Sequence, residues 1–206
     1  MKVKQLLIPV LTIALFILNA CGGGSKKDYS KEVDEGTFSG NIFTSQALGW
    51  TMEFPDNWMI TSKSSLESLD ERSKAIAGDS TSNMSGIKRT LAFQKNFDNN
   101  FQSSWEDFSG DEAQYKRIIS NIHKMIYNNY LNQRTTLDSI NGTQKIGNIL
   151  FDTYQIALYD RDNKNFANQL LLTSIVKNKF MTVTIAYNND ADRKKMLDLF
   201  KKSAFK

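Results

Sequence analysis

The C-terminal half of the chain is a succession of strand-like segments joined by short polar turns. The predicted strands cover residues 135–140, 144–159, 166–176 and 180–187. Asn141-Gly142 is a typical pair for a tight hairpin turn, and Gly147 marks a kink in the strand that follows. Strands joined by turns this short run antiparallel, because a parallel connection needs about a dozen residues or more. This half of the chain therefore predicts an antiparallel meander.

Helical patterns flank the meander. Residues 111–132 carry one apolar stripe at i, i+3, i+4, i+7 spacing, and residues 191–202 are expected to form a helix capped by Asn189 or Asp190. A shorter helix is expected to begin with the capping-box spacing at Ser64. Because the helices precede and follow the strands, the predicted class is α+β, with an antiparallel β-sheet sandwiched between helices. Apolar residues on both faces of 166–176 indicate that this strand is covered on both sides.

The first half of the chain begins with a strand over residues 48–54, where apolar and polar side chains alternate. Residues 55–57 turn the chain, and Trp58 starts a second strand that we expect to lie beside the first. Another alternating strand is expected over residues 87–93. Residues 95–109 lack a clear period and are interpreted as an otherwise polar loop anchored by Trp105 and Phe108, with a short strand inside it left open.

The first 21 residues have the parts of a bacterial lipoprotein signal. Lys2 and Lys4 precede an apolar run from Leu6 to Leu18, which is too short to span a bilayer and has the length of a secretory signal. The run ends in Leu18-Asn19-Ala20-Cys21, which resembles the lipobox of bacterial lipoproteins. In that family the cysteine sulfur receives a diacylglyceryl group, and cleavage leaves the cysteine first. The alternative is an ordinary signal peptide before a chance cysteine, but Cys21 is the only cysteine and occupies the lipobox position.

The chain is expected to divide into a lipoprotein signal peptide (residues 1–20), a flexible tether (21–40) and a single domain (41–206). The tether starts with three glycines after Cys21 and continues as a charged stretch without apolar periodicity. A coil of about 16 residues spans roughly 20–25 Å, so the domain can stand clear of a membrane or lie against it. The 186 residues left after cleavage are enough for one well-buried domain.

Charge and cysteine content exclude several kinds of site. Without Lys2 and Lys4 the chain has 24 basic and 22 acidic side chains, a net charge of +2, so no nucleic acid is expected as a partner. Once Cys21 is acylated, no thiol remains for a disulfide, a nucleophile or a cysteine-based metal site. We expect no cofactor. Gly22 stands where enteric bacteria place the Asp of inner-membrane retention, so the expected location is the cell envelope, and the outer membrane if the cell is Gram-negative.

Two stretches together resemble the PsbP-like family. Residues 48–58, Leu-Gly-Trp-Thr-Met-Glu-Phe-Pro-Asp-Asn-Trp, are similar to the opening hairpin of these domains. The final strands, the basic helix and Ser203-Ala204-Phe205 are similar to their end. The family includes PsbP of photosystem II, a Ran-binding nuclear-import factor and small bacterial envelope lipoproteins of the DcrB type. The resemblance covers about residues 41–206 and implies a PsbP-like α/β/α sandwich with a binding or scaffolding role. It supplies no catalytic residue.

Residue patterns do not indicate a catalytic site. His123, the only histidine, lies about 100° from the centre of the apolar stripe of its helix, which makes it a boundary residue. A Ser-His-Asp triad would need this histidine, but the chain has no Gly-x-Ser-x-Gly elbow. Ser80 and Ser139 each follow an Asp in a triplet that resembles an O-glycosylation site. Such triplets occur by chance about once in a chain of this size, so the sequence leaves their modification open.

The C-terminal helix supplies the one candidate contact surface. A helical wheel places its basic and apolar residues on opposite sides. The basic side carries Lys194, Lys195, Lys201 and Lys202, with Asp198 among them, and the apolar side carries Met196, Leu197, Phe200 and Ala204. The basic side is either a solvated face or a surface that meets anionic headgroups or an acidic partner.

The leading hypothesis is a membrane-anchored envelope lipoprotein, held by lipid on Cys21, whose domain is not an enzyme. Such a domain binds an envelope protein partner or assists assembly. The alternatives are a carrier of a small apolar ligand and a hydrolase without a recognisable motif. A deep pocket lined by titratable groups would favour the hydrolase, a dry apolar cavity the carrier, and a flat face with exposed aromatics a protein partner.

The lipid anchor can be tested directly. Each buried methylene contributes about 0.8 kcal/mol, so two or three acyl chains hold a protein on the membrane almost irreversibly. Cys21→Ser should abolish incorporation of radioactive palmitate and release the protein from carbonate-washed membranes. Continued labelling and membrane retention of this variant would show that the lipobox interpretation is wrong.

Overall fold

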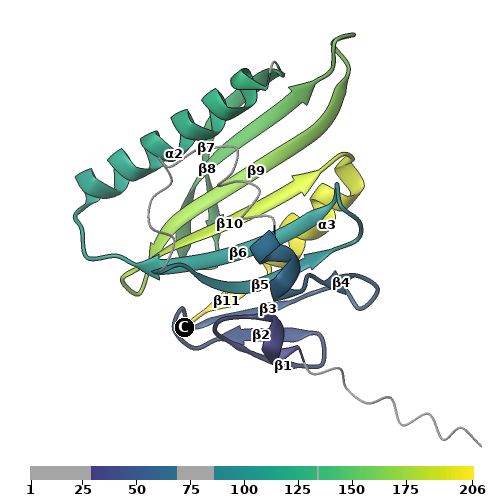
Figure 1. Ribbon diagram of the computed structural model, residues 1–206. Coiled ribbons are helices and arrows are strands. Elements are labelled where there is room, and N and C mark those ends of the chain that lie inside the picture. The colour runs from purple at the N-terminus through teal and green to yellow at the C-terminus, as the bar shows by residue number, and fades with distance from the viewer. Residues whose placement is uncertain (1–28, 69–85, 134) are drawn as a thin grey trace, which may run out of the picture.

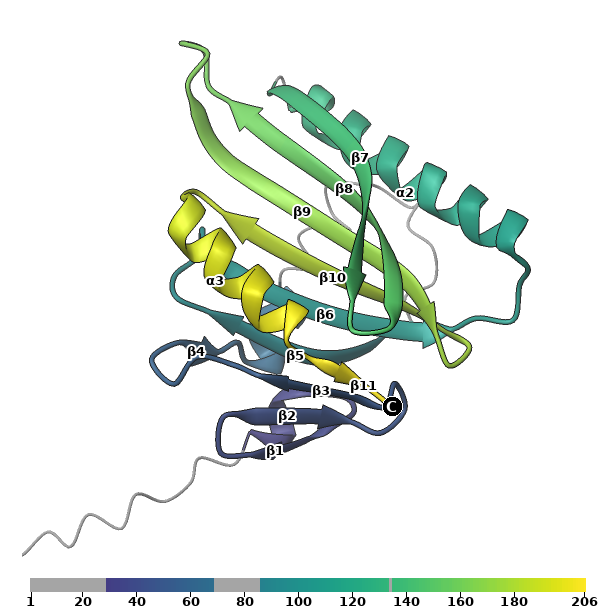
Figure 2. The ribbon, with the colours of Figure 1, turned by 180° about the vertical axis from the view of Figure 1, so that it is seen from behind.

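The computed structural model describes residues 29–68, 86–133 and 135–206. These residues form two antiparallel sheets with helices on both faces of the larger one (Figure 1). The long helix α2 (Glu112–Asn132) covers one face, and α3 (Asp190–Lys201) covers the other together with the smaller sheet (Figure 2). The prediction of an α+β chain with an antiparallel sheet between helices is therefore confirmed.

The larger sheet has seven strands in the order β4-β5-β6-β10-β9-β8-β7. Its strands are β4 (Met59–Ile60), β5 (Lys88–Gln94), β6 (Asn100–Asp107), β7 (Thr136–Ile146), β8 (Ile149–Tyr159), β9 (Asn165–Val176) and β10 (Lys179–Tyr187). The last four in the chain are successive neighbours, as the short turns predicted. Leu172 of β9 packs on the α3 side and Leu171 on the α2 side, which confirms that this strand is covered on both faces.

The smaller sheet has four strands in the order β1-β2-β3-β11. They are β1 (Thr37–Ser39), β2 (Ile42–Ser45), β3 (Trp50–Glu53) and β11 (Ala204–Phe205), and a short 3-10 helix η1 (Ser30–Glu32) precedes them. The prediction that the strand from Trp58 lies beside β3 is wrong. β4 pairs with β5 in the larger sheet, because the turn after Phe54 carries the chain from one sheet to the other.

The main core lies between the smaller sheet, α3 and the larger sheet. Its largest fully buried side chains are Phe43, Trp50, Phe93, Phe101, Phe151 and Phe200. Phe93 and Phe101 stack at 4.9 Å between ring centres, and Trp50 meets Phe200 edge to face at 5.9 Å. Ring pairs of this kind stabilise a fold by about 0.5–1.5 kcal/mol beyond the area that they bury. The aromatic contacts therefore join the two sheets and α3 into one body.

Helix starts differ slightly from those predicted. The carboxylate of Asp111 accepts from the Gln114 amide at 2.7 Å and caps α2, which begins one residue after the predicted start. Asn189 caps α3 as predicted. Residues 63–68 are helical and begin after Ser62, whose hydroxyl accepts from the amide of residue 65, so the cap lies two residues before the predicted one. The rest of that predicted helix lies outside the described residues.

The predicted hairpin at Asn141-Gly142 is wrong. β7 continues through this pair, and the chain turns at Gly147, where the predicted kink is a two-residue turn between Ile146 and Ile149. Gly147 has a φ of 57°, which glycine adopts without strain. The later turn lets β7 and β8 pair at all 11 positions and buries Ile146 completely. Long-range pairing therefore outweighs the local turn preference of Asn-Gly.

Residues 95–109 contain a strand of 8 residues, longer than the short strand that the sequence left open for this loop. Residues 100–107 form β6, and Phe101, Ser103 and Trp105 alternate into the core. The buried Ser103 hydroxyl donates to the Leu91 carbonyl at 2.7 Å and lies 2.8 Å from the Thr90 hydroxyl. A polar side chain can occupy a core position when its hydrogen bonds are made there. Ser103 therefore interrupts the alternation of apolar and polar residues by which the sequence would have indicated this strand.

The predicted domain boundary at residue 41 lies too late. η1 and β1 precede it, and Val33 is buried in the main core. The Asp34 carboxylate pairs with Lys63 and accepts from the Arg89 amide at 2.9 Å. The domain thus begins by residue 29, while residues 1–28, including Cys21, lie outside the described part of the chain. Among the helices that the structure describes, none is long and apolar enough to cross a membrane.

Candidate binding surfaces

The four predicted lysines are all exposed, three of them in α3 and Lys202 directly after it. They do not form one uniform basic face. Lys194 pairs with Asp198 at 2.5 Å, one helical turn away. Lys195 reaches Asn57, at 3.5 Å, and its ammonium lies 5.5 Å from the centre of the Trp58 ring. Half of the predicted face is therefore engaged by neighbouring groups. Ala204, predicted for the apolar side of this helix, instead lies exposed in β11 after α3 has ended.

A groove of about 500 Å³ separates α3 from the turn between β3 and β4. We call it the α3 groove. Lys195 and Lys202 line one side of it, and Glu53 and Asp56 line the other, with Asp198 on the helix. The hydrogen bond from Lys194 lowers the pKa of Asp198, so this carboxylate remains charged well into the acid range. The α3 groove thus presents charges of both signs.

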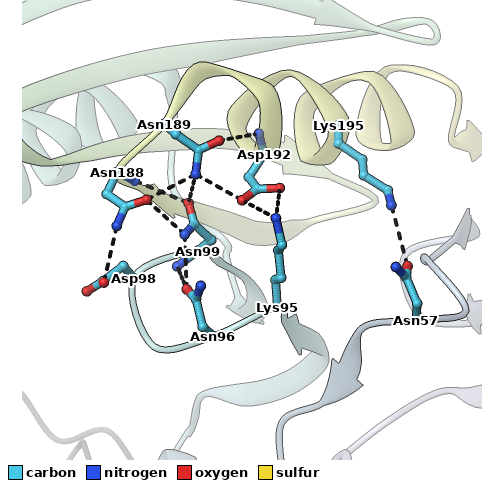
Figure 3. Close-up of polar contacts among 9 residues, drawn as sticks. All are labelled: Asn57, Lys95, Asn96, Asp98, Asn99, Asn188, Asn189, Asp192 and Lys195. Atoms are coloured by element: carbon cyan, nitrogen blue, oxygen red, sulfur yellow. Dashed lines mark hydrogen bonds and ion pairs between the residues drawn. The ribbon is translucent and has the colours of Figure 1, made fainter.

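A polar network fixes the start of α3 to the β5–β6 turn (Figure 3). The buried Asn99 side chain donates to Asn188, and its carbonyl accepts from the Asn188 amide at 3.2 Å. Lys95 reaches both oxygens of Asp192 at 3.0 Å, and Asn189 donates to the same carboxylate at 2.9 Å. These contacts hold α3 at one end while Phe200 anchors its other end in the core. The α3 groove therefore lies against a helix fixed at both ends.

The α3 groove lies at the end of the domain where the described chain begins. The ring of Tyr29 packs against Phe54 at 6.2 Å and against Phe38 at 5.5 Å. Phe54 also lines the α3 groove. Any anchor that precedes residue 29 would therefore hold this end of the domain toward its attachment point.

A second groove of about 380 Å³, which we call the α2 groove, lies between α2 and the β7–β8 pair. Lys116, Ser120 and His123 line it from the helix, and Asn141 and Asp152 line it from the strands. The Asp152 carboxylate accepts from the Tyr115 hydroxyl at 2.9 Å and from Lys116 at 3.2 Å. Burial, followed by the contact with Asp152, raises the pKa of Tyr115 far above its ordinary value, so this hydroxyl stays protonated.

His123 is half-buried at the boundary of α2, as predicted. Its ring stacks on Tyr154 with 4.0 Å between centres, and it hydrogen-bonds with Asn141. Burial lowers its pKa, so the ring is neutral near pH 7. A catalytic triad would require a carboxylate and a hydroxyl on the two ring nitrogens. The observed contacts of the ring are instead the stack on Tyr154 and the hydrogen bond with Asn141.

A third open groove follows β6, where residues 107–112 meet the β9–β10 turn. Lys179 pairs with Asp107 at its rim, and Tyr115 closes its floor. All three grooves are open to solvent and mix charged with apolar lining. Within the described ranges, no group of three or more His, Cys, Asp or Glu side chains is placed to hold a metal ion.

Of the predicted modification sites, only Ser139 lies in the described part of the chain. Ser139 is exposed on β7, whereas Ser80, like Cys21, lies outside the described residues. The sequence interpretation missed Asp152 and Asn141, because their meeting with His123 depends on the β7–β8 register. A hairpin at Asn141-Gly142 would have separated them. The only local pattern that could have indicated this groove was the spacing of Lys116 and His123, which lie seven residues apart on one helix.

The ion pair at the start of α3 should make stability depend on pH. Burial raises the pKa of Asp192, but hydrogen bonds from Asn189 and Lys95 outweigh it, and the net pKa is lowered from 3.8. A lowered folded-state pKa stabilises the fold above the unfolded value, and this contribution is lost as pH falls through the folded value. Asp192→Asn should therefore lower the free energy of unfolding at pH 7 by about 1.5–3 kcal/mol, and the difference should shrink in urea titrations below about pH 4.

Asp190→Asn is the matched control, because the Asp190 side chain is 93% exposed and lies in the same helical turn. Its effect should stay within about 0.5 kcal/mol. A difference between wild type and Asp192→Asn that stays constant into strong acid would contradict the assignment.

Comparison with known proteins gives a fold and not an activity. Neither a family model nor a curated protein matches the sequence. Among solved structures, the chain is similar to cyanobacterial PsbP (CyanoP) from Synechocystis sp. PCC 6803, with a TM-score of 0.52 at 11% identity over 92% of this chain and 99% of that one. A protein from Bacteroides thetaiotaomicron VPI-5482 matches with a TM-score of 0.44 at 11% identity, over 82% of this chain and 49% of that one. The two-sheet domain with α2 and α3 on opposite faces thus has the PsbP-like fold that the sequence resemblance implied.

Proposed function

We propose that this chain is a lipid-anchored protein of the cell envelope whose PsbP-like domain binds a protein partner and is not an enzyme. The anchor is the lipid predicted on Cys21, and the contact surface is the α3 groove. The sequence supports the anchor, and the likeness to CyanoP supports an accessory domain.

The mixed charge of the α3 groove is the observation that carries the proposal. Lys195 and Lys202 face Glu53 and Asp56 across a space of about 500 Å³. A layer of anionic headgroups would be attracted by the lysines and repelled by the carboxylates. A protein surface can present both signs in a fixed arrangement, which gives specificity and register. The α3 groove therefore suits a protein partner better than a lipid surface.

The other two functions fit the described residues less well. A carrier of a small apolar ligand buries most of its ligand in an enclosed apolar site, whereas the α3 groove and the α2 groove are open and lined by charged groups. A hydrolase needs a base in contact with a nucleophile. His123 instead stacks on Tyr154 and bonds with Asn141.

The geometry of attachment favours the same surface. Tyr29 packs on Phe54, which lines the α3 groove, so a tether that precedes Tyr29 leaves from this end of the domain. The tether from Cys21 to Tyr29 is 8 residues long, and a coil of this length has a root-mean-square span of roughly 15 Å. The α3 groove is thus held within reach of proteins in or on the same membrane.

Site-specific photocrosslinking in native membranes tests the proposal. Full-length protein carrying a photoreactive residue at Asn57 or Lys202 should form one discrete adduct with a second protein. The same residue at Arg117, which is exposed on α2 at the opposite face, should not form it. Reversing both lysines, by Lys195→Glu with Lys202→Glu, should reduce the adduct at Asn57 on the order of tenfold, because interfacial charge reversal costs several kcal/mol.

Two results would contradict the proposal. Equal adducts from Asn57 and Arg117 would show that the α3 groove has no preferred partner. Crosslinks to lipid alone would show that the α3 groove lies against the membrane and that its lysines contact anionic headgroups, the alternative given for this helix in the sequence analysis.

A further inference from the structure

Strand β7 leaves a long sheet edge open. It pairs with β8 at all 11 of its positions, without a shift in register, and no other described strand pairs with it. Residues 138–143 in its middle are all exposed. The other outer strands of the two sheets are short, with three residues in β1 and two each in β4 and β11. β7 is therefore the one long edge among the described strands.

The turn at Gly147 determines which backbone groups point outward. Ile146 and Ile149 flank a two-residue turn, and such a flanking pair exchanges its hydrogen bonds within the hairpin. Alternation then directs the amide and carbonyl groups of the even-numbered residues toward β8, and those of the odd-numbered residues outward. Thr135 agrees with this phase, because its amide points away from β8 and donates to the Tyr130 carbonyl at 3.1 Å.

The middle of this edge lacks the features that block strand addition. Natural edges are protected by lysine, proline, a bulge or shortness. Residues 137–144 contain neither lysine nor proline, and β7 has no bulge. Ile140 is the one large apolar side chain exposed on β7, at 69%, and it lies one position from the centre of the strand.

We propose that β7 pairs antiparallel with β7 of a second copy of this chain, with Ile140 on the twofold axis. Each outward pair, Ser139 with Asn141 of the second copy, then exchanges backbone hydrogen bonds. Ile140 meets Ile140 of the second copy in a non-hydrogen-bonded pair, where side chains approach most closely. The two sheets become continuous, and this proposal does not depend on the function proposed for the α3 groove.

The charges and sizes along β7 fit this register. Asp138 lies opposite Gly142 of the second copy, and Thr136 lies opposite Gln144. Neither Asp138 nor Lys145 meets its own copy, so no like charges face each other across the pair. The pairing buries the exposed isoleucine against an identical side chain, which an unrelated strand would supply only by coincidence. Self-complementarity about Ile140 is what selects a second copy as the occupant.

Disulfide crosslinking of the full-length protein in native membranes tests the register. Ile140→Cys places two thiols on a non-hydrogen-bonded pair, whose Cα atoms lie about 4.5 Å apart, within disulfide range. Asp138→Cys places its two Cα atoms about 13 Å apart along the strands, beyond that range. With a mild added oxidant, Ile140→Cys should give on the order of tenfold more covalent homodimer than Asp138→Cys or wild type, since only its geometry permits the bond.

A matched pair of second-site variants tests the backbone hydrogen bonds. Ser139→Pro removes an outward amide and leaves the β8 ladder intact, so it should abolish the crosslink of Ile140→Cys, whereas Ser139→Ala should keep it. Thermal melting of both variants checks that each is folded. Equal crosslinking of Ile140→Cys and Asp138→Cys overturns the proposal. So does a crosslink that survives Ser139→Pro, or one that joins Ile140→Cys only to a different protein.

Discussion

The packing of the Trp50 side chain in the main core is the interaction on which the rest of this structure depends. Its side chain is fully buried, and its ring contacts aromatic side chains of β6, α3 and β11. Its ring stacks on Phe101 and Phe205 and meets Phe200 edge to face. Phe54, which follows β3, adds a ring contact with Phe93 of β5 at 6.3 Å. The aromatic core therefore joins the two sheets into one domain.

The shape of the α3 groove is determined by the packing of this core. Its helical wall is held by Phe200 at one end and by the Lys95–Asp192 contact at the other, and its opposite wall is the turn that leads from one sheet to the other. The charges on the two walls therefore keep a fixed separation. The same reasoning applies to the α2 groove, where Tyr115 ties the helix to Asp152 of β8 and to the Thr173 carbonyl of β9.

Features set by local periodicity could be predicted from the sequence, and features set by distant pairing could not. The stripe of α2, the cap of α3 and the apolar faces of β9 are encoded within a few residues, so their prediction is confirmed. The pairing of β11 with β3 joins residues about 150 positions apart, and no local pattern indicates it. The choice of Gly147 over Asn141-Gly142 rests on pairing at 11 positions. Lys195 appeared to be part of a simple basic face, because its contact with Asn57 spans 138 residues.

Urea unfolding of Phe200→Ala tests most directly whether the aromatic core holds the two sheets and α3 as one cooperative unit. Losing a buried Phe costs about 3–5 kcal/mol, and the account predicts that size of loss in a single transition for all parts of the domain. Phe166→Ala, whose side chain is 50% exposed on β9, is the matched control and should cost less than about 1 kcal/mol. Similar losses for the two variants, or separate transitions for the two sheets, would contradict the account.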